Sequence, residues 1–513
     1  MPASQKTMHR SPRASQPTRF QPWAAILLSI VAIALGSPNR LLHVYPAALL
    51  GLAPLLYLCW QKPLRQQIRY CTATWVGVCS LIFLPDPFSV EALTEGEIIG
   101  GIIAAPLVPL YFIAATLLSL QLTQQCGLWL RPLAIAAVWT SFDGFFGIVQ
   151  FPLPLHYGAC LFNWLVAIQI ADMTSIWGAT FLAISSNAAL AALWIAPPPK
   201  RWLAIAFPLG LWIAALAYGT IRLSVLESEV ADSYRIATLQ PVAWLEADRS
   251  WSYRDRRYRE LQEFSTAAIA AGADLVAWPE GAMRAQVEDT DLEERVIDPL
   301  LVQLPEGGGL IVGASEPLPD QQGVAWDRLK FVNSALLYGS DGSIRDRYGK
   351  QWLFQYFETA RYVPSEGGYR PLEAGDRLGQ LGVAICLESV MPRASRSLVR
   401  RGAQSLLTIS DDSWFGRSNW PILHSVLSVF RAIETRRSFT FVNNTGGNLV
   451  VAPSGRILER GPLWQRKTVS GIVSLRSELT IASRWGDWLA WGCLGITGLL
   501  AGLKVRSPHS RSS

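Results

Sequence analysis

The stretch LGVAIC, Leu381–Cys386, is an apolar run of strand length that ends on a thiol. Two other stretches of strand length also end on an ionisable residue. DLVAWPE, Asp274–Glu280, ends on a carboxylate, and SIRDRYGK, Ser343–Lys350, ends on an amine. Residues at the ends of strands in an α/β sheet project into the crevice where ligands bind. We therefore expect the three terminal side chains to meet in one site.

Around these runs the sequence alternates between strands and helices. The expected strands are Arg235–Leu239, Asp274–Trp278, Gly309–Gly313, Val332–Tyr338, Gly382–Cys386, Ser405–Ser410 and Ser438–Asn443. The expected helices are Tyr253–Ala271 and Trp420–Thr435, and Asp341-Gly342 marks a hairpin turn before Lys350. This order predicts an α/β layered domain over residues 230–475.

The composition outside this domain is that of a membrane protein. Of 513 residues, 50% are hydrophobic and only 16% are charged, whereas soluble proteins carry about 25% charged residues. The 21 Trp fit a chain with many membrane–water boundaries. The net charge is +6, but the basic residues cluster beside apolar runs and not on one face, so we expect no nucleic acid partner.

Eight apolar stretches can cross a bilayer, most of them near the roughly 20 residues that a spanning helix needs. They are 23–37, 41–60, 70–85, 98–120, 130–150, 165–195, 202–224 and 488–503. We expect a polar leader (1–22), a membrane domain of seven helices (23–224), a last spanning helix (485–504) and a tail (505–513). Prolines and polar breaks in 151–174 indicate a re-entrant or interfacial piece. A cleaved signal peptide is the alternative for the first stretch, although no small-x-small site follows it.

The basic residues predict the orientation of these helices. They gather in the leader, in alternate loops and in the tail: Lys6, Arg10, Arg13, Arg19, Lys62, Arg65, Arg69, Lys200, Arg201, Lys504, Arg506 and Arg511. The loop between the third and fourth stretches holds Asp86, Glu91, Glu95 and Glu97 without Lys or Arg. Both termini are therefore expected in the cytoplasm, with the α/β domain on the periplasmic side of a bacterial inner membrane.

Of the seven cysteines, only Cys386 lies in the α/β domain. No CxxC pair or Cys/His cluster has metal-ligand spacing, so no metal is expected. An unpaired thiol in an oxidising compartment is a candidate reactive group. Acyl transfer needs a nucleophile, a base and a cation for the oxyanion, and Cys386, Glu280 and Lys350 supply these parts. A nearby ammonium is also expected to lower the pKa of the thiol.

Taken singly, each of the three residues also has a structural interpretation. Cys386 fits a small buried hydrophobic residue, Glu280 a helix-start residue, and Lys350 a solvated loop charge.

The ordered motifs resemble the nitrilase superfamily, and the membrane shell around them resembles the apolipoprotein N-acyltransferase family in particular. The matching pieces are VAWPEG (276–281), the lysine segment, GVAICLES (382–389), DDSWFGRS (411–418), RAIETRR (431–437), NNTGGN (443–448) and QIADMTSIWGATFLAISSNAAL (169–190). The resemblance implies an αββα sandwich and a ping-pong transfer without a cofactor. It implies a membrane phospholipid as acyl donor, diacylglyceryl-modified apolipoproteins as acceptors, and a monomer.

The resemblance also assigns roles to residues. Cys386 is the nucleophile that forms a thioester, Glu280 the general base and acid, and Lys350 with the Leu387 N–H the oxyanion site. The supporting or substrate-binding residues are Glu358, Leu387, Glu388 and Trp414. The segment after the lysine departs from the family pattern, because Trp352–Phe357 reads WLFQYF and lacks the usual His, Pro and Gly. It fits contact with lipid or packing in the core equally well. Two alternatives stay open, a membrane-tethered amidase and a non-catalytic membrane-bound homologue.

Overall fold

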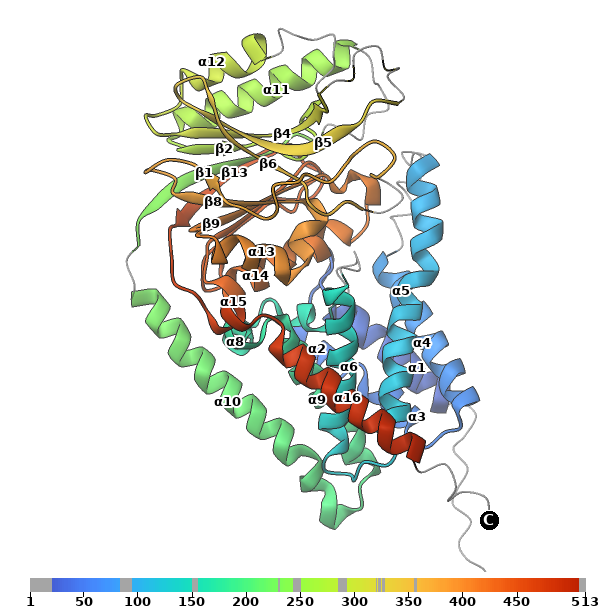
Figure 1. Cartoon of the computed structure of the whole chain (residues 1–513). Coiled ribbons are helices and arrows are strands. Elements are labelled where there is room, and N and C mark those ends of the chain that lie inside the picture. Colours follow the sequence, from blue (N-terminus) through green and yellow to red (C-terminus); the bar gives the residue numbers. More distant parts are fainter. Residues whose placement is uncertain are drawn as a thin grey trace, which may run out of the picture.

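The computed structural model describes residues 21–83, 95–149, 156–228, 231–242, 251–284, 293–319, 321, 324, 328–354 and 358–506. An α/β domain lies at one end of the molecule and a bundle of helices at the other (Figure 1). The expected leader up to residue 20, the acidic loop 84–94 and the tail from residue 507 lie outside the described residues.

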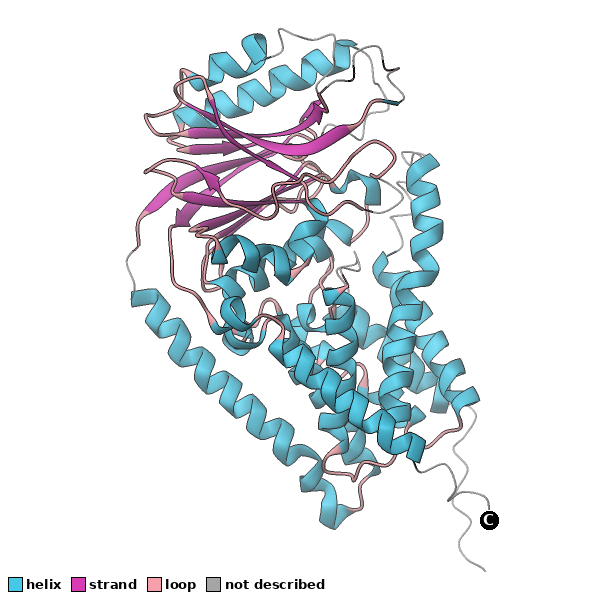
Figure 2. Cartoon of the chain, in the orientation of Figure 1, coloured by secondary structure: helices cyan, strands magenta, loops and turns pink. Residues whose placement is uncertain are grey.

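The α/β domain contains two stacked sheets (Figure 2). The first has the strand order β13-β1-β2-β4-β5-β6, with β3 paired to β4, and the second has the order β12-β11-β10-β9-β8-β7. The strands of the first sheet are β1 (Ser233–Gln240), β2 (Leu275–Ala277), β3 (Met283–Arg284), β4 (Gly309–Pro317), β5 (Phe331–Gly339), β6 (Ile344–Gly349) and β13 (Lys467–Ser474). Those of the second are β7 (Leu372–Glu373), β8 (Gln380–Ile385), β9 (Ser405–Ser410), β10 (Phe439–Asn443), β11 (Leu449–Val451) and β12 (Ile457–Arg460).

Helices cover the outer face of each sheet, which makes the domain an αββα sandwich (Figure 1). Helices α11 (Trp251–Ala270) and α12 (Asp298–Leu301) lie over the first sheet, and α13 (Pro392–Arg400) and α14 (Trp420–Thr435) lie over the second. Side chains such as Ile236, Ile311 and Val383 form an apolar core between the sheets. A run of apolar residues makes a strand here because both of its faces are buried. The expected fold of this domain is confirmed.

The expected strands and helices lie close to their predicted limits. The second predicted helix, Trp420–Thr435, is α14 to the residue. The predicted hairpin joins β5 to β6, and Gly342 adopts a positive φ of 85° in its turn. Glycine suits this position because it carries no Cβ.

The remaining helices form the bundle beneath the α/β domain (Figure 1). They are α1 (Gln21–Gly36), α2 (Tyr45–Ala48), α3 (Ala53–Cys59), α4 (Leu64–Phe83), α5 (Glu95–Leu122), α6 (Arg131–Ile148), α7 (Leu165–Ile168), α8 (Ala171–Thr174), α9 (Ile176–Ile195), α10 (Arg201–Ser228), α15 (Ile481–Trp485) and α16 (Trp488–Arg506). Among the described residues, three helices are long and apolar enough to cross a membrane, within α9, α10 and α16.

Two of the expected spanning stretches are not single helices. The stretch 41–60 contains α2 and α3, and the stretch 165–195 contains α7, α8 and α9. Ser175 has a φ of 57° and separates α8 from α9, and such a left-handed residue cannot continue a helix. Broken helices in 157–174 agree with the predicted interruption of that segment.

The α/β domain and the bundle are joined by buried ion pairs. Arg436, directly after α14, donates to Asp172 of α8 at 2.6 Å, and both side chains are buried. Arg396 of α13 pairs with Asp487, which also accepts a hydrogen bond at 2.7 Å from the indole of Trp177. The RAIETRR motif thus lies where the two parts of the chain meet. A buried charge needs its partner, so these pairs hold the domain in one position on the bundle.

Candidate active site

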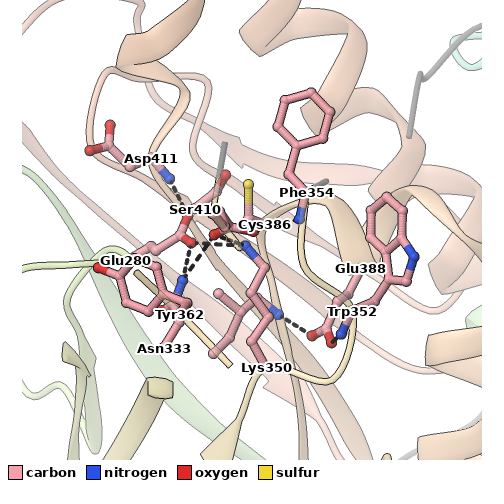
Figure 3. Close-up of polar contacts among 12 residues, drawn as sticks. Glu280, Asn333, Lys350, Trp352, Phe354, Tyr362, Cys386, Glu388, Ser410 and Asp411 are labelled. Carbon is pink, nitrogen blue, oxygen red and sulfur yellow. Dashed lines mark hydrogen bonds and ion pairs between the residues drawn. The ribbon is translucent and has the colours of Figure 1, made fainter. Parts of the chain in front are cut away.

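Lys350 lies at the centre of the site, directly after β6 (Figure 3). Its backbone N–H donates to the carbonyl of Asn333 on β5, which fixes the chain at this point. The side chain is buried, and Nζ donates to Glu358 Oε1 at 2.7 Å and to Glu280 Oε1 at 3.2 Å. Burial alone would lower the pKa of Lys350, but the Glu280 and Glu358 carboxylates raise it well above its ordinary value. Lys350 is therefore a fixed ammonium.

Glu280 follows β2 and is held by three donors. Its Oε1 accepts a hydrogen bond from Asn333 Nδ2 at 2.6 Å as well as from Lys350, and its Oε2 accepts from the backbone N–H of Asp411 at 3.0 Å (Figure 3). Glu280 is buried, with 8% of the residue exposed. The carboxylate is thereby fixed just after the end of β2.

Cys386 follows β8 and is the first residue of the short helix η7 (Cys386–Val390). Its φ of 55° places a non-glycine residue in the left-handed region, a strained conformation that is common at functional sites. The residue is partly exposed, in contrast to buried Lys350. Figure 3 shows it beside Glu280 and Lys350, so the structure brings the three predicted residues together.

The groups around the thiol shift its pKa in both directions. Lys350 lowers the pKa of Cys386, as expected, but burial and the Glu280 carboxylate outweigh it and raise the pKa well above its ordinary value. Glu358, the second carboxylate that pairs with Lys350, adds to this rise. The resting thiol is therefore neutral, and a base must remove its proton during reaction.

Glu388 accepts four hydrogen bonds that hold the backbone of the site in position. Its Oε1 accepts the backbone N–H groups of Gln351 and Trp352, at 2.7 and 3.1 Å, and its Oε2 accepts from Ile385 N and Tyr348 Oη, at 2.8 and 2.9 Å. Burial raises the pKa of this carboxyl to about 7. One side chain thus ties the segment after Lys350 to the end of β8.

The other predicted residues surround this centre. Glu358 contacts Lys350 and also accepts the backbone N–H of Phe354 at 2.7 Å. Leu387 is buried in η7. Trp414 lies in the short helix η8 (Asp412–Phe415), and its side chain lies outside the described residues.

The altered segment after the lysine is described only up to residue 354. Trp352 and Phe354 pack against the large apolar cluster that includes α14 and the bundle helices. Residues 355–357 lie outside the described residues.

Asn333 and Tyr348 were missed by sequence reasoning. Asn333 also reaches Glu358 Oε1 at 3.4 Å, so it joins both carboxylates that contact the lysine. Its only signal is a polar side chain at a buried position of a strand. Within the described part of the chain, no three His, Cys, Asp or Glu side chains are grouped as metal ligands.

Comparison with known proteins gives a consistent result. Residues 235–478 match the carbon-nitrogen hydrolase family. The chain is 28% identical to the apolipoprotein N-acyltransferase of Geobacter metallireducens, over 94% of each chain. It is 22% identical to the protein of that name from Chlorobaculum tepidum, over 94% of this chain and 96% of that protein. An amidase from Nesterenkonia sp. AN1 of known structure is 21% identical, with a TM-score of 0.37, and the match covers 50% of this chain and 99% of the amidase. Residues 235–478 therefore form a carbon-nitrogen hydrolase, or nitrilase-like, domain, and along nearly its whole length the chain is similar to the apolipoprotein N-acyltransferases.

Proposed function

We propose that this protein is a phospholipid:apolipoprotein N-acyltransferase. One observation carries the proposal: the thiol of a half-buried cysteine lies beside a buried carboxylate–ammonium pair, in a domain that packs directly on apolar helices. Proteins named apolipoprotein N-acyltransferase match both parts of the chain. Their name supports the acceptor, a lipoprotein whose N-terminal cysteine carries a diacylglyceryl group.

In the first half-reaction the acyl chain moves to Cys386. Glu280 takes the thiol proton, and Sγ attacks the sn-1 ester carbonyl of a phospholipid to form the C–S bond. An ammonium has three N–H donors, of which Glu280 and Glu358 receive two. The third, with the Leu387 N–H, stabilises the oxyanion. The ester C–O bond then breaks, Glu280 protonates the departing alkoxide, and a lysophospholipid leaves.

In the second half-reaction the thioester acylates an amine. The α-amine of the acceptor cysteine attacks the thioester carbon, and Glu280 takes the proton that the nitrogen loses. The C–N bond forms, the C–S bond breaks, and Glu280 returns the proton to Sγ. No metal or redox partner is needed, because each bond that breaks is replaced by one bond of similar kind.

A phospholipid substrate implies that the reaction takes place at a bilayer. Exposing an acyl chain to water costs about 0.8 kcal/mol per CH₂, so the reaction belongs at a membrane surface. Helix α10 leads from the far end of the bundle to the α/β domain, and α16 leads back (Figure 1). Such tethers on both sides of the domain would keep it at the membrane surface.

The charges at the far end of the bundle support the orientation. Lys504, near the end of α16, donates to the carbonyl of Gln121 in the last turn of α5 at 2.8 Å. Figure 1 shows the C-terminal end of α16 at the end of the bundle remote from the α/β domain. Basic residues gather on the cytoplasmic side. The domain then faces the periplasm, and both termini face the cytoplasm.

The decisive experiment is complementation in a strain depleted of its own acyltransferase, with mass spectrometry of lipoprotein N-termini. Wild type is expected to restore the third acyl chain, and Cys386→Ala is expected not to. Incubation of purified protein with a phospholipid should give a hydroxylamine-sensitive adduct on Cys386. If lipoproteins stay diacylated while small amides are hydrolysed, the protein is an amidase. If neither occurs, it is a non-catalytic homologue.

A further inference from the structure

A buried chain of polar side chains lies against the backbone of the nucleophile. Asp412 of η8, His424 of α14 and Ser389 of η7 are each at most 2% exposed. His424 Nδ1 lies 3.0 Å from Asp412 Oδ1, and its Nε2 lies 3.0 Å from Ser389 Oγ. Three separate elements thus meet on one imidazole ring.

This chain ends on the backbone of the nucleophile. Ser389 Oγ donates to the carbonyl oxygen of Cys386 at 2.9 Å, and His424 Nε2 lies 3.2 Å from the same oxygen. The carbonyl oxygen of Cys386 therefore lies within hydrogen-bond distance of two buried side chains. The direct contacts of this chain are therefore with the main chain of Cys386.

Neighbouring side chains hold the far end of this chain. Asp412 accepts from Ser410 Oγ at 3.1 Å and from Asn443 Nδ2 at 2.9 Å, and its two carboxylate oxygens lie 3.0 and 3.2 Å from His424 Nδ1. The imidazole is therefore held at both nitrogens, by Asp412 at Nδ1 and by Ser389 and the Cys386 carbonyl at Nε2.

The carbonyl of Cys386 and the N–H of Leu387 belong to the same peptide group. A trans peptide is planar, so its C=O and N–H point in opposite directions. Two side chains that hold the oxygen therefore also fix the direction of the Leu387 N–H, which points away from them. Hydrogen bonds to the oxygen also polarise the peptide and make its N–H a stronger donor.

We propose that Asp412, His424 and Ser389 form a positioning relay, which holds the Cys386–Leu387 peptide so that its N–H stabilises the oxyanion. The inference rests on the proposed function, in which that N–H is one of the two oxyanion donors. The relay residues touch no reacting atom. Their effect should appear only in reactions at Cys386 that pass through an oxyanion.

Two reactions of the same thiol test this. Thioester formation passes through an oxyanion, whereas alkylation by iodoacetamide does not, and both need the thiolate. The ratio of the two rates therefore cancels any change in thiol acidity. Both are measured by mass spectrometry of the Cys386 peptide, using the full-length protein with phospholipid and, separately, with a p-nitrophenyl ester as acyl donor.

His424→Leu keeps most of the volume but has no donor, and the ratio is expected to fall about 100-fold, the cost of losing one oxyanion donor. His424→Gln restores one N–H and should recover at least about tenfold of that loss. Ser389→Ala is expected to lower the ratio about tenfold and decides the question if His424→Leu does not fold. His43→Leu, in the loop before α2, is the control and should leave the ratio unchanged.

The proposal is overturned if the ratio in His424→Leu, or in Ser389→Ala where that variant decides, stays within threefold of wild type. The proposal is also overturned if acylation and alkylation slow by the same factor. The two acyl donors separate this result from failure of the proposed function. A wild-type protein that accepts the p-nitrophenyl ester but no phospholipid refutes the function, and the relay is still tested with the ester.

Discussion

Replacing Glu280 by glutamine removes one negative charge from the site and keeps the size of the side chain. The carboxylate accepts from Asn333, Lys350 and the backbone of Asp411. If the single amide oxygen of glutamine keeps the first two donors, its NH₂ group faces the N–H of Asp411. This contact between two donors is expected to cost about 1–3 kcal/mol of stability. The variant should still fold, because Lys350 retains Glu358 as its partner.

The two reactions of Cys386 are expected to change in opposite directions. Thioester formation loses its general base and should slow about 10²- to 10⁴-fold. Alkylation by iodoacetamide at pH 7 should become faster, because among the neighbouring charges Glu280 contributes most to the raised pKa of Cys386. Two charges about 4 Å apart interact by at least about 1 kcal/mol, so an increase of about fivefold or more is expected.

The assay follows both adducts on the Cys386 peptide by mass spectrometry. Glu316→Gln is the matched control, because Glu316 forms an exposed ion pair with Arg347 at 2.8 Å at the end of β4. It should change neither rate. If both reactions of Glu280→Gln slow by the same factor, Glu280 only supports the fold. If thioester formation keeps its wild-type rate, Glu280 is not the base.

Other residues of the structure give three further predictions. Asn333→Ala removes a hydrogen bond to a charged group and should slow thioester formation about tenfold, with alkylation as the reference reaction. Burial raises the pKa of Glu388 to about 7 from 4.5, so between these values the folded protein keeps a proton that the unfolded chain loses. The free energy of unfolding should therefore fall by about 3 kcal/mol as the pH rises through this range, and thermal melts of Glu388→Gln should lack that slope. Arg436→Ala leaves Asp172 buried without this partner and should cost about 3–5 kcal/mol in thermal melts, whereas exposed Arg347→Ala should cost at most about 1 kcal/mol.

The sequence alone predicted the layers of the α/β domain and the meeting of Glu280, Lys350 and Cys386. Both predictions depend on local patterns. An apolar run of strand length is buried in a sheet wherever the sheet forms, and the residue that ends the run lies at the carboxyl end of that strand. The same reasoning was weaker in the bundle, where Ser175 divides a continuous apolar stretch. Hydropathy does not register a single residue with a positive φ.

Only the tertiary structure decided how the site is charged. A lysine near a thiol is expected to lower its pKa, and Lys350 does so, but burial and the carboxylates of Glu280 and Glu358 outweigh it and the pKa of Cys386 rises. The acidity of a buried group is a sum over every charge around it, and these charges come from strands and loops far apart in the chain. For the same reason no sequence pattern shows that His424, on a helix 38 residues beyond the nucleophile, contacts its carbonyl.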